Sequence, residues 1–93
     1  MQFYKITIIL HPSISSRIHT LVGEVDEETT ILKGLLSILS EEEDIFRILI
    51  SGDNIRYGYL ILSDKVELRT TKKINTKMST DMQIRIIPIS HGG

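Results

Sequence analysis

One stripe of apolar residues at helical spacing, with strand patterns on both sides of it, limits most strongly what this chain can fold into. The stripe runs from Ile31 to Leu39 and is broad enough to pack against a sheet. Thr30 precedes it as a helix N-cap, and the acids before Thr30 lie near the positive end of the helix dipole. Gly34 inside the stripe costs up to about 1 kcal/mol relative to alanine, and a close approach of the helix to a sheet would explain it.

The residues before the helix predict two strands. Apolar residues alternate with polar ones between Tyr4 and Leu10, and Pro12 ends this first strand because proline cannot donate to a ladder. Residues 17–25 supply the second strand, and the short connection between the two strands favours a hairpin.

The residues after the helix predict further strands. The acids Glu41 to Asp44 predict a solvated exit, and the apolar run 45–50 is short enough to be either a strand or irregular chain that lines the core. Strands are predicted at residues 57–62, 66–68 and 82–89, with a polar and basic connector at 69–79. A hairpin, one helix and then more strands predict an α+β fold, in which a mixed sheet packs one face on one main helix.

Composition restricts the class of protein. The chain has 93 residues, which fit one domain, and its 41% of hydrophobic residues with few aromatics predict an aliphatic core. It has no cysteine, which removes disulfides, thiolate metal ligands and a cysteine nucleophile. A net charge of −1 argues against direct binding of nucleic acid, and the apolar runs are too short for a membrane span. Without a signal-type N-terminal segment, we expect the protein in the cytoplasm.

The C-terminal sequence predicts where the chemistry takes place. Residues 90–93, with the sequence Ser-His-Gly-Gly, directly follow the apolar run 84–89. Glycine has no Cβ, so a glycine pair makes a thin tail that can enter a narrow channel, and the main-chain carboxylate of Gly93 is then the least hindered group. A terminal glycine pair also arises by chance in roughly one chain in 200. The pair is therefore informative mainly because a predicted buried strand runs to within a few residues of it. We expect a single domain over residues 1–93 with a flexible tail at 90–93.

Two segments resemble a known family. Residues 54–64 are similar to the segment that leads into the third strand of the ubiquitin-related modifiers, whose members are also sulfur carriers. Residues 82–93 resemble that family's last strand and its His-Gly-Gly ending, and Ile87-Pro88 is also similar to molybdopterin-synthase small subunits and thiamine-type sulfur carriers. The resemblance implies a ubiquitin-like β-grasp fold. The chain departs from the family just before the last strand, where residues 78–81 replace an aspartate- or glycine-rich turn, and in its lysine-rich connector.

The resemblance also implies a function. In that family, a partner enzyme related to ubiquitin-activating enzymes uses ATP to adenylate the tail carboxylate, which here belongs to Gly93. Sulfur transfer to the adenylate leaves a thiocarboxylate, as in tRNA thiolation, whereas attack by a target-protein lysine leaves an isopeptide bond. The implied partners are therefore the activating enzyme, a sulfur donor or thiolation enzyme, and target lysines. Neither route needs a catalytic residue, a metal or a bound cofactor in this chain, so we expect no enzyme. His91 and Gly92 would be recognised in the channel of the activating enzyme.

The family's fold places the first and last strands side by side and so predicts a partner surface. The alternation that turns Ile8 and Ile86 toward the helix turns their sequence neighbours outward. We therefore expect an exposed apolar patch that leads to the tail and binds a partner, made of Phe3, Ile9, Ile87, Pro88 and Ile89. The alternative is that bulges or extra coverage bury these side chains.

Two other kinds of protein remain compatible with the sequence. One is a non-catalytic β-grasp interaction module whose glycine pair is incidental. The other is the small subunit of a sulfur-transfer enzyme, whose tail stays inserted in its partner. The histidines His11, His19 and His91 show no spacing typical of metal ligands, and solvated faces explain the acids 41–44 and the basic connector better than ion sites do.

Overall fold

The structure, a computed structural model, describes residues 1–89; residues 90–93, which form the predicted tail, lie outside the described residues. The chain begins with the strands β1 (Phe3–Leu10) and β2 (Thr20–Asp26) and the helices α1 (Ile31–Leu39) and α2 (Glu43–Leu49). The later elements are β3 (Ile50–Ser51), β4 (Asn54–Ile55), β5 (Tyr59–Ser63), β6 (Val66–Glu67), the 3₁₀ helix η1 (Lys73–Asn75) and β7 (Met82–Pro88).

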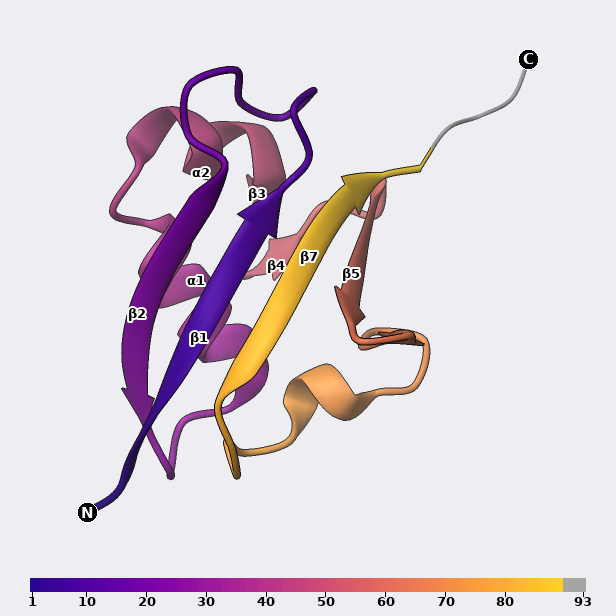
Figure 1. The fold of residues 1–93 in the computed structure, drawn as a ribbon. Coiled ribbons are helices and arrows are strands. Elements are labelled where there is room, and N and C mark those ends of the chain that lie inside the picture. Colours follow the sequence, from indigo (N-terminus) through magenta and orange to yellow (C-terminus); the bar gives the residue numbers. More distant parts are fainter. Residues whose placement is uncertain (90–93) are drawn as a thin grey trace.

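The main sheet has five strands in the order β2-β1-β7-β5-β6. β1 pairs antiparallel with β2 and parallel with β7, and β5 pairs antiparallel with both β7 and β6. α1 lies across one face of this sheet, behind β1 and β2 in the view of Figure 1. The predicted hairpin and the predicted mixed sheet on one main helix are therefore confirmed, and the last strand lies in the centre of the sheet.

The loop between β1 and β2 is longer than predicted. Ile18 N–H donates to Ser15 Oγ at 2.9 Å within this loop, and the Ile14 side chain is buried in the core. These local contacts hold residues 15–18 in the loop, so β2 begins later than the predicted start at residue 17.

The core lies between the sheet and α1. Ile6 and Ile8 of β1 and Ile84 and Ile86 of β7 are buried, as their alternation predicts. They meet the buried face of α1, which consists of Ile31, Gly34, Leu35, Ile38 and Leu39. Full burial of an aliphatic side chain contributes about 1.5–3 kcal/mol, so these contacts stabilise the fold and also fix which face of β7 points inward.

Two glycines allow α1 to lie close to the sheet. A Cβ at Gly34 would lie 3.0 Å from Ile6 Cδ1 and 3.1 Å from Val25 Cγ1. At Gly23 on β2, a Cβ would lie only 2.5 Å from Ile38 Cγ1. The close approach predicted as the reason for Gly34 is confirmed, and a second one occurs near the C-terminal end of the helix.

The prediction for residues 45–50 was wrong, because most of them form the helix α2 rather than a strand or irregular chain. Ile45 and Leu49 are buried one turn apart, and Arg47 Nη2 pairs with Glu43 Oε1 at 2.8 Å across the same spacing. Two of the acids predicted to form a solvated exit make the first turn of this helix, where negative charge is favourable. Apolar residues fill nearly every position of the run, so its pattern does not separate helix from strand.

The connector between β6 and β7 is bonded to the start of α1. Ile31 N–H donates to Thr76 O at 2.9 Å, and Met78 N–H donates to Thr29 O at 3.0 Å. Ile74 and Met78 are buried in the core. The connector, predicted as polar, therefore also supplies apolar side chains and holds the beginning of β7 against the helix.

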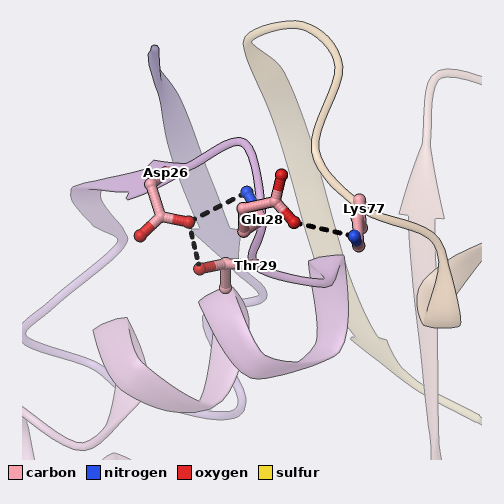
Figure 2. Close-up of polar contacts among 4 residues, drawn as sticks. All are labelled: Asp26, Glu28, Thr29 and Lys77. Atoms are coloured by element: carbon pink, nitrogen blue, oxygen red, sulfur yellow. Dashed lines mark hydrogen bonds and ion pairs between the residues drawn. The ribbon is translucent and has the colours of Figure 1, made fainter. Parts of the chain in front are cut away.

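Polar side chains reinforce this joint, as Figure 2 shows. Asp26 Oδ1 accepts hydrogen bonds from Glu28 N–H at 2.9 Å and from Thr29 Oγ1 at 3.0 Å, and Lys77 Nζ donates to Glu28 Oε2 at 2.7 Å. The Thr30 side chain accepts from a backbone N–H of the first helical turn, which confirms the predicted N-cap. The acids before the helix thus hold the preceding turn rather than lying in the first turn of α1.

Candidate functional site

The end of β7 separates from β1 at a proline. His11 N–H donates to Ile86 O at 3.2 Å, which is the last bond of the parallel ladder within residues 1–89. The next bond would need an N–H at position 88, and Pro88 has none. The His11 carbonyl instead accepts from Ile14 N–H at 2.9 Å, inside the following loop. Pro88 therefore releases the chain from β1.

The other side of β7 stays attached. Pro88 pairs with Tyr59 of β5, and Ile89 N–H donates to Gly58 O at 2.8 Å. The described chain therefore ends on a bond to the residue just before β5. The predicted tail, residues 90–93, directly follows this attached residue in the sequence.

The outward face of the sheet brings Ile9 and Ile87 together, because both line one hollow beside the end of β1. The strand register adds Leu60, which pairs with Ile87, and Leu62, which pairs with Arg85. Leu60 and Leu62 stand on either side of the buried Ile61 in the strand, so their side chains point to the opposite, outward face of the sheet. We call Ile9, Leu60, Leu62 and Ile87 the outer patch. The alternation around Ile61 was the signal that would have added the two leucines to the predicted patch.

Phe3 does not belong to the outer patch, which corrects the prediction. Phe3 is 57% exposed, as predicted, but it is the first residue of β1. The parallel register aligns the start of β7, Met82, with Ile6 in the middle of β1. The outer patch therefore lies beside the far end of β1, and a strand of this length spans about 25 Å.

Ile89 and Pro88 lie next to the outer patch. Pro88 is half-buried at the end of β7, and Ile89 is 39% exposed. Ile89 lines a hollow of about 250 Å³ that Leu60 also lines, so the hollow is continuous with the outer patch. We call it the exit hollow; its lining consists of Tyr57, Tyr59, Leu60, Glu67, Arg69, Thr70 and Ile89.

Arg69 binds the loop that carries Gly58. Its guanidinium donates hydrogen bonds to the carbonyls of Ile55, Arg56 and Tyr59, and its Cζ lies 5.3 Å from the centroid of the Tyr57 ring. A planar guanidinium with several donors suits such a cluster of carbonyls. Sequence reasoning placed Arg69 in a solvated basic connector. Without knowledge of the fold, the sequence holds no signal that would have found this role.

Glu67 holds the backbone around Arg69. Its carboxylate accepts hydrogen bonds from Ile61 N–H at 2.9 Å, Arg69 N–H at 2.9 Å and Thr70 N–H at 2.7 Å. Partial burial alone would raise the pKa of Glu67, but the hydrogen bonds from Thr70, Ile61 and Arg69 together outweigh it and lower the pKa below its ordinary value. The folded chain therefore favours the ionised form of the Glu67 carboxyl group over the protonated form.

Replacing Glu67 by glutamine should remove a pH-dependent part of the stability. The pKa of Glu67 is lower in the folded than in the unfolded chain, so its contribution is present above the unfolded pKa and is lost as the pH falls through the folded pKa. We expect Glu67→Gln to be less stable than the natural protein at pH 7, with a gap that shrinks as the pH falls below about 4.3. Urea unfolding between pH 7 and pH 3 measures this gap. A gap that does not change with pH would contradict the assignment.

His11 and His19, for which the sequence predicted no metal site, lie in the loop between β1 and β2. His11 Nδ1 lies 2.8 Å from Ser13 Oγ in the loop after β1, and His19 is exposed. Within residues 1–89, no group of three or more His, Cys, Asp or Glu side chains is arranged to hold a metal ion. His91, Gly92 and Gly93, the predicted activated end and its recognition residues, lie outside the described residues.

None of the helices that the structure describes is both long enough and apolar enough to span a bilayer.

A mixed sheet that packs on one main helix, with the last strand at its centre, defines a ubiquitin-like β-grasp protein. Solved structures share this fold. Small archaeal modifier protein 1 of Methanosarcina acetivorans matches with a TM-score of 0.70 at 17% identity and 100% coverage of both chains. The protein of the same name from Haloferax volcanii gives a TM-score of 0.75 at 12% identity and covers 96% of this chain and 99% of its own.

Urm1 of Sulfolobus solfataricus is also similar, with a TM-score of 0.54, 27% identity, and coverage of 89% of this chain and 99% of that chain. No model of a known protein family and no curated protein matches the chain. The solved structures thus confirm the β-grasp fold that the resemblance implies, and their names are those of modifier proteins, in line with the family that the sequence resembles.

Proposed function

We propose that this chain is a ubiquitin-like sulfur carrier or protein modifier of the cytoplasm, whose Gly93 carboxylate is adenylated by a partner activating enzyme. The observation that carries the proposal is the position of β7. Ile84 and Ile86 anchor this strand in the core at the centre of the sheet, and it leads out beside the outer patch toward the glycine pair. The fold shared with small archaeal modifier protein 1 and Urm1 supports the same kind of function.

The proposed chemistry needs only the terminal carboxylate from this chain. Attack of the Gly93 carboxylate on the α-phosphorus of ATP expels pyrophosphate and makes an acyl-adenylate, from which AMP can leave. A persulfide then displaces AMP, and a second thiol cleaves the resulting S–S bond to leave a thiocarboxylate. A lysine amine of a target protein displaces AMP directly and leaves an isopeptide bond. ATP and the catalytic groups belong to the partner.

The outer patch is the proposed docking surface for the activating enzyme. Ile9 and Ile87 lie at the end of the sheet where the chain leaves it, and Leu60 connects them to the exit hollow. Apolar side chains of this kind gain free energy when a partner removes them from water. Arg85 lines the same region and places positive charge beside it, so an apolar partner surface with acidic residues fits best.

Intact-mass measurement of the protein from its native host, and after incubation with its activating enzyme, ATP, magnesium and a sulfur donor, tests the proposal. We expect a species heavier by the difference between one sulfur and one oxygen atom, or larger conjugates that release the chain on proteolysis. A sample without ATP is the control. Unmodified protein under all conditions would favour the plain interaction module. Permanent copurification with one catalytic subunit would favour a dedicated small subunit.

A further inference from the structure

We propose that Arg69 is a positioning residue for the tail, because its guanidinium fixes the loop to which the end of β7 is bonded. The inference rests on the proposed function, since a fixed exit point matters when the terminal carboxylate must reach an active site in a partner. It concerns a residue that contacts neither ATP nor the reacting carboxylate. It therefore acts through geometry alone.

The end of β7 is attached to the sheet on one side only. Pro88 cannot donate to the carbonyl of His11, and that carbonyl is already bonded to Ile14 N–H at 2.9 Å. Ile89 N–H donates to Gly58 O at 2.8 Å. Beyond the last bond to the β1 side, at Ile86, the position of Gly58 therefore decides where the chain leaves the sheet.

Packing does not hold Gly58 itself in place. Arg56, Tyr57 and Gly58 are all exposed, and a Cβ added at Gly58 would meet no atom within 4 Å. Before Gly58, Arg56 is bonded to the end of α2, through its N–H and Leu49 O at 2.8 Å and through its Nε and Ile48 O at 3.1 Å; after Gly58, Tyr59 packs on the core. Tyr57 and Gly58 lie between these two attachments, so a side chain that bridges the attachments from outside would hold the loop in one conformation.

Arg69 bridges these attachments from outside the loop. Its guanidinium binds the carbonyls of Ile55, Arg56 and Tyr59, which lie on both sides of Gly58, and its Cζ stands over the Tyr57 ring. Arg69 N–H is in turn bonded to Glu67 Oε1 at 2.9 Å. One side chain thus joins the loop to the short β6 strand.

The expected functional consequence is a change in turnover without a change in docking. The outer patch contains neither Arg69 nor Gly58, so binding to the activating enzyme should not depend on them. A loose exit lets the tail leave in many directions and lowers the fraction of docked complexes in which the carboxylate is placed for attack. Loss of Arg69 should therefore lower kcat and leave KM nearly unchanged.

Hydrogen exchange followed by NMR tests the structural half with Arg69→Met, which keeps much of the side-chain length and removes the donors. We expect the Ile89 amide to exchange about tenfold faster or more, and the Leu10 amide, bonded to His19 O on the other side of the sheet, to change less than about twofold. Arg47→Met is the matched control, since Arg47 makes one exposed ion pair on α2. Unchanged exchange at Ile89 would overturn the proposal.

Adenylation kinetics with the activating enzyme test the functional half. We expect Arg69→Met to lower kcat about tenfold with KM within about twofold, and Arg47→Met to change neither. If the methionine variant fails to fold, Arg69→Lys replaces it; lysine keeps the charge but cannot bridge three carbonyls as a planar fork does. A rise in KM at constant kcat would overturn the positioning role. If the natural protein is never adenylated, the proposed function fails, while exchange at Ile89 still decides whether Arg69 sets the exit.

Discussion

Deletion of Gly92 and Gly93 should abolish adenylation and leave the thermal unfolding midpoint of the domain nearly unchanged. The last buried residue of the described chain is Ile86, and the described hydrogen bonds end at Ile89. The domain therefore keeps its core and its ladders when the glycine pair is removed, whereas the reacting carboxylate moves back toward the bulk of the domain. Pyrophosphate release with the activating enzyme and thermal denaturation by circular dichroism measure the two effects.

An extended chain provides the matched control for this deletion. Alanine added after Gly93 keeps both glycines but converts the Gly93 carboxylate into an amide, which is no nucleophile toward ATP. We expect this variant to fold, to dock and to give no adenylate at Gly93. Continued AMP transfer to the terminus of the shortened chain would show that the glycine pair is not required, and the proposed role of Gly93 would then be abandoned.

Replacement of Ile8 by aspartate should unfold the domain. Ile8 is fully buried on the face of β1 that packs against α1, and among the described residues no charged side chain is buried near it to serve as a partner. An unpaired carboxylate at this position loses its hydration, and the cavity and packing losses add to that cost, so we expect destabilisation of more than about 4 kcal/mol. Loss of the cooperative transition in circular dichroism would be the result.

Ile87→Asp is the comparison on the opposite face of the same sheet. Ile87 is half-buried in the outer patch, where a new carboxylate can stay hydrated. We expect the domain to fold and its binding to the activating enzyme to weaken by about tenfold or more, because an apolar contact is lost and a charge must be desolvated. If Ile87→Asp unfolds the protein as completely as Ile8→Asp does, the assignment of the two faces is wrong.

Periodicity made much of the fold predictable. The alternation in β1 and the helical stripe of α1 each identify one buried face, and Thr30 identifies the start of the helix. The run 45–50 was unpredictable for the opposite reason, because side chains that are nearly all apolar carry no period. Ile14 and Met78 are buried within loops, and Ile74 is buried in the short 3₁₀ helix η1. Neither a loop nor a three-residue helix has a repeating geometry long enough for their burial to follow from a sequence pattern.

The candidate site was predictable only where it depends on alternation. Ile9 and Ile87 face outward for that reason, and the structure brings them together. By alternation, Phe3 lies on the same face as Ile9, but it stands at the other end of β1. Only the register shows that β7 runs beside the end of β1 that carries Ile9 and not beside Phe3. Arg69 contacts a loop that lies ten or more residues before it in the sequence. Contacts between such irregular segments depend on the completed fold, so no local pattern announces them.

The central position of β7 has a consequence for how the protein is made. β1 and β5 do not pair with each other; β7, which follows both of them in the sequence, fills the space between them and bonds to both. A nascent chain that still lacks β7 leaves the edges of two strands unpaired, so the sheet closes only after translation has passed residue 88. Contacts so distant in sequence slow folding. Newly made chains should accordingly need protection from edge-to-edge aggregation until β7 emerges from the ribosome.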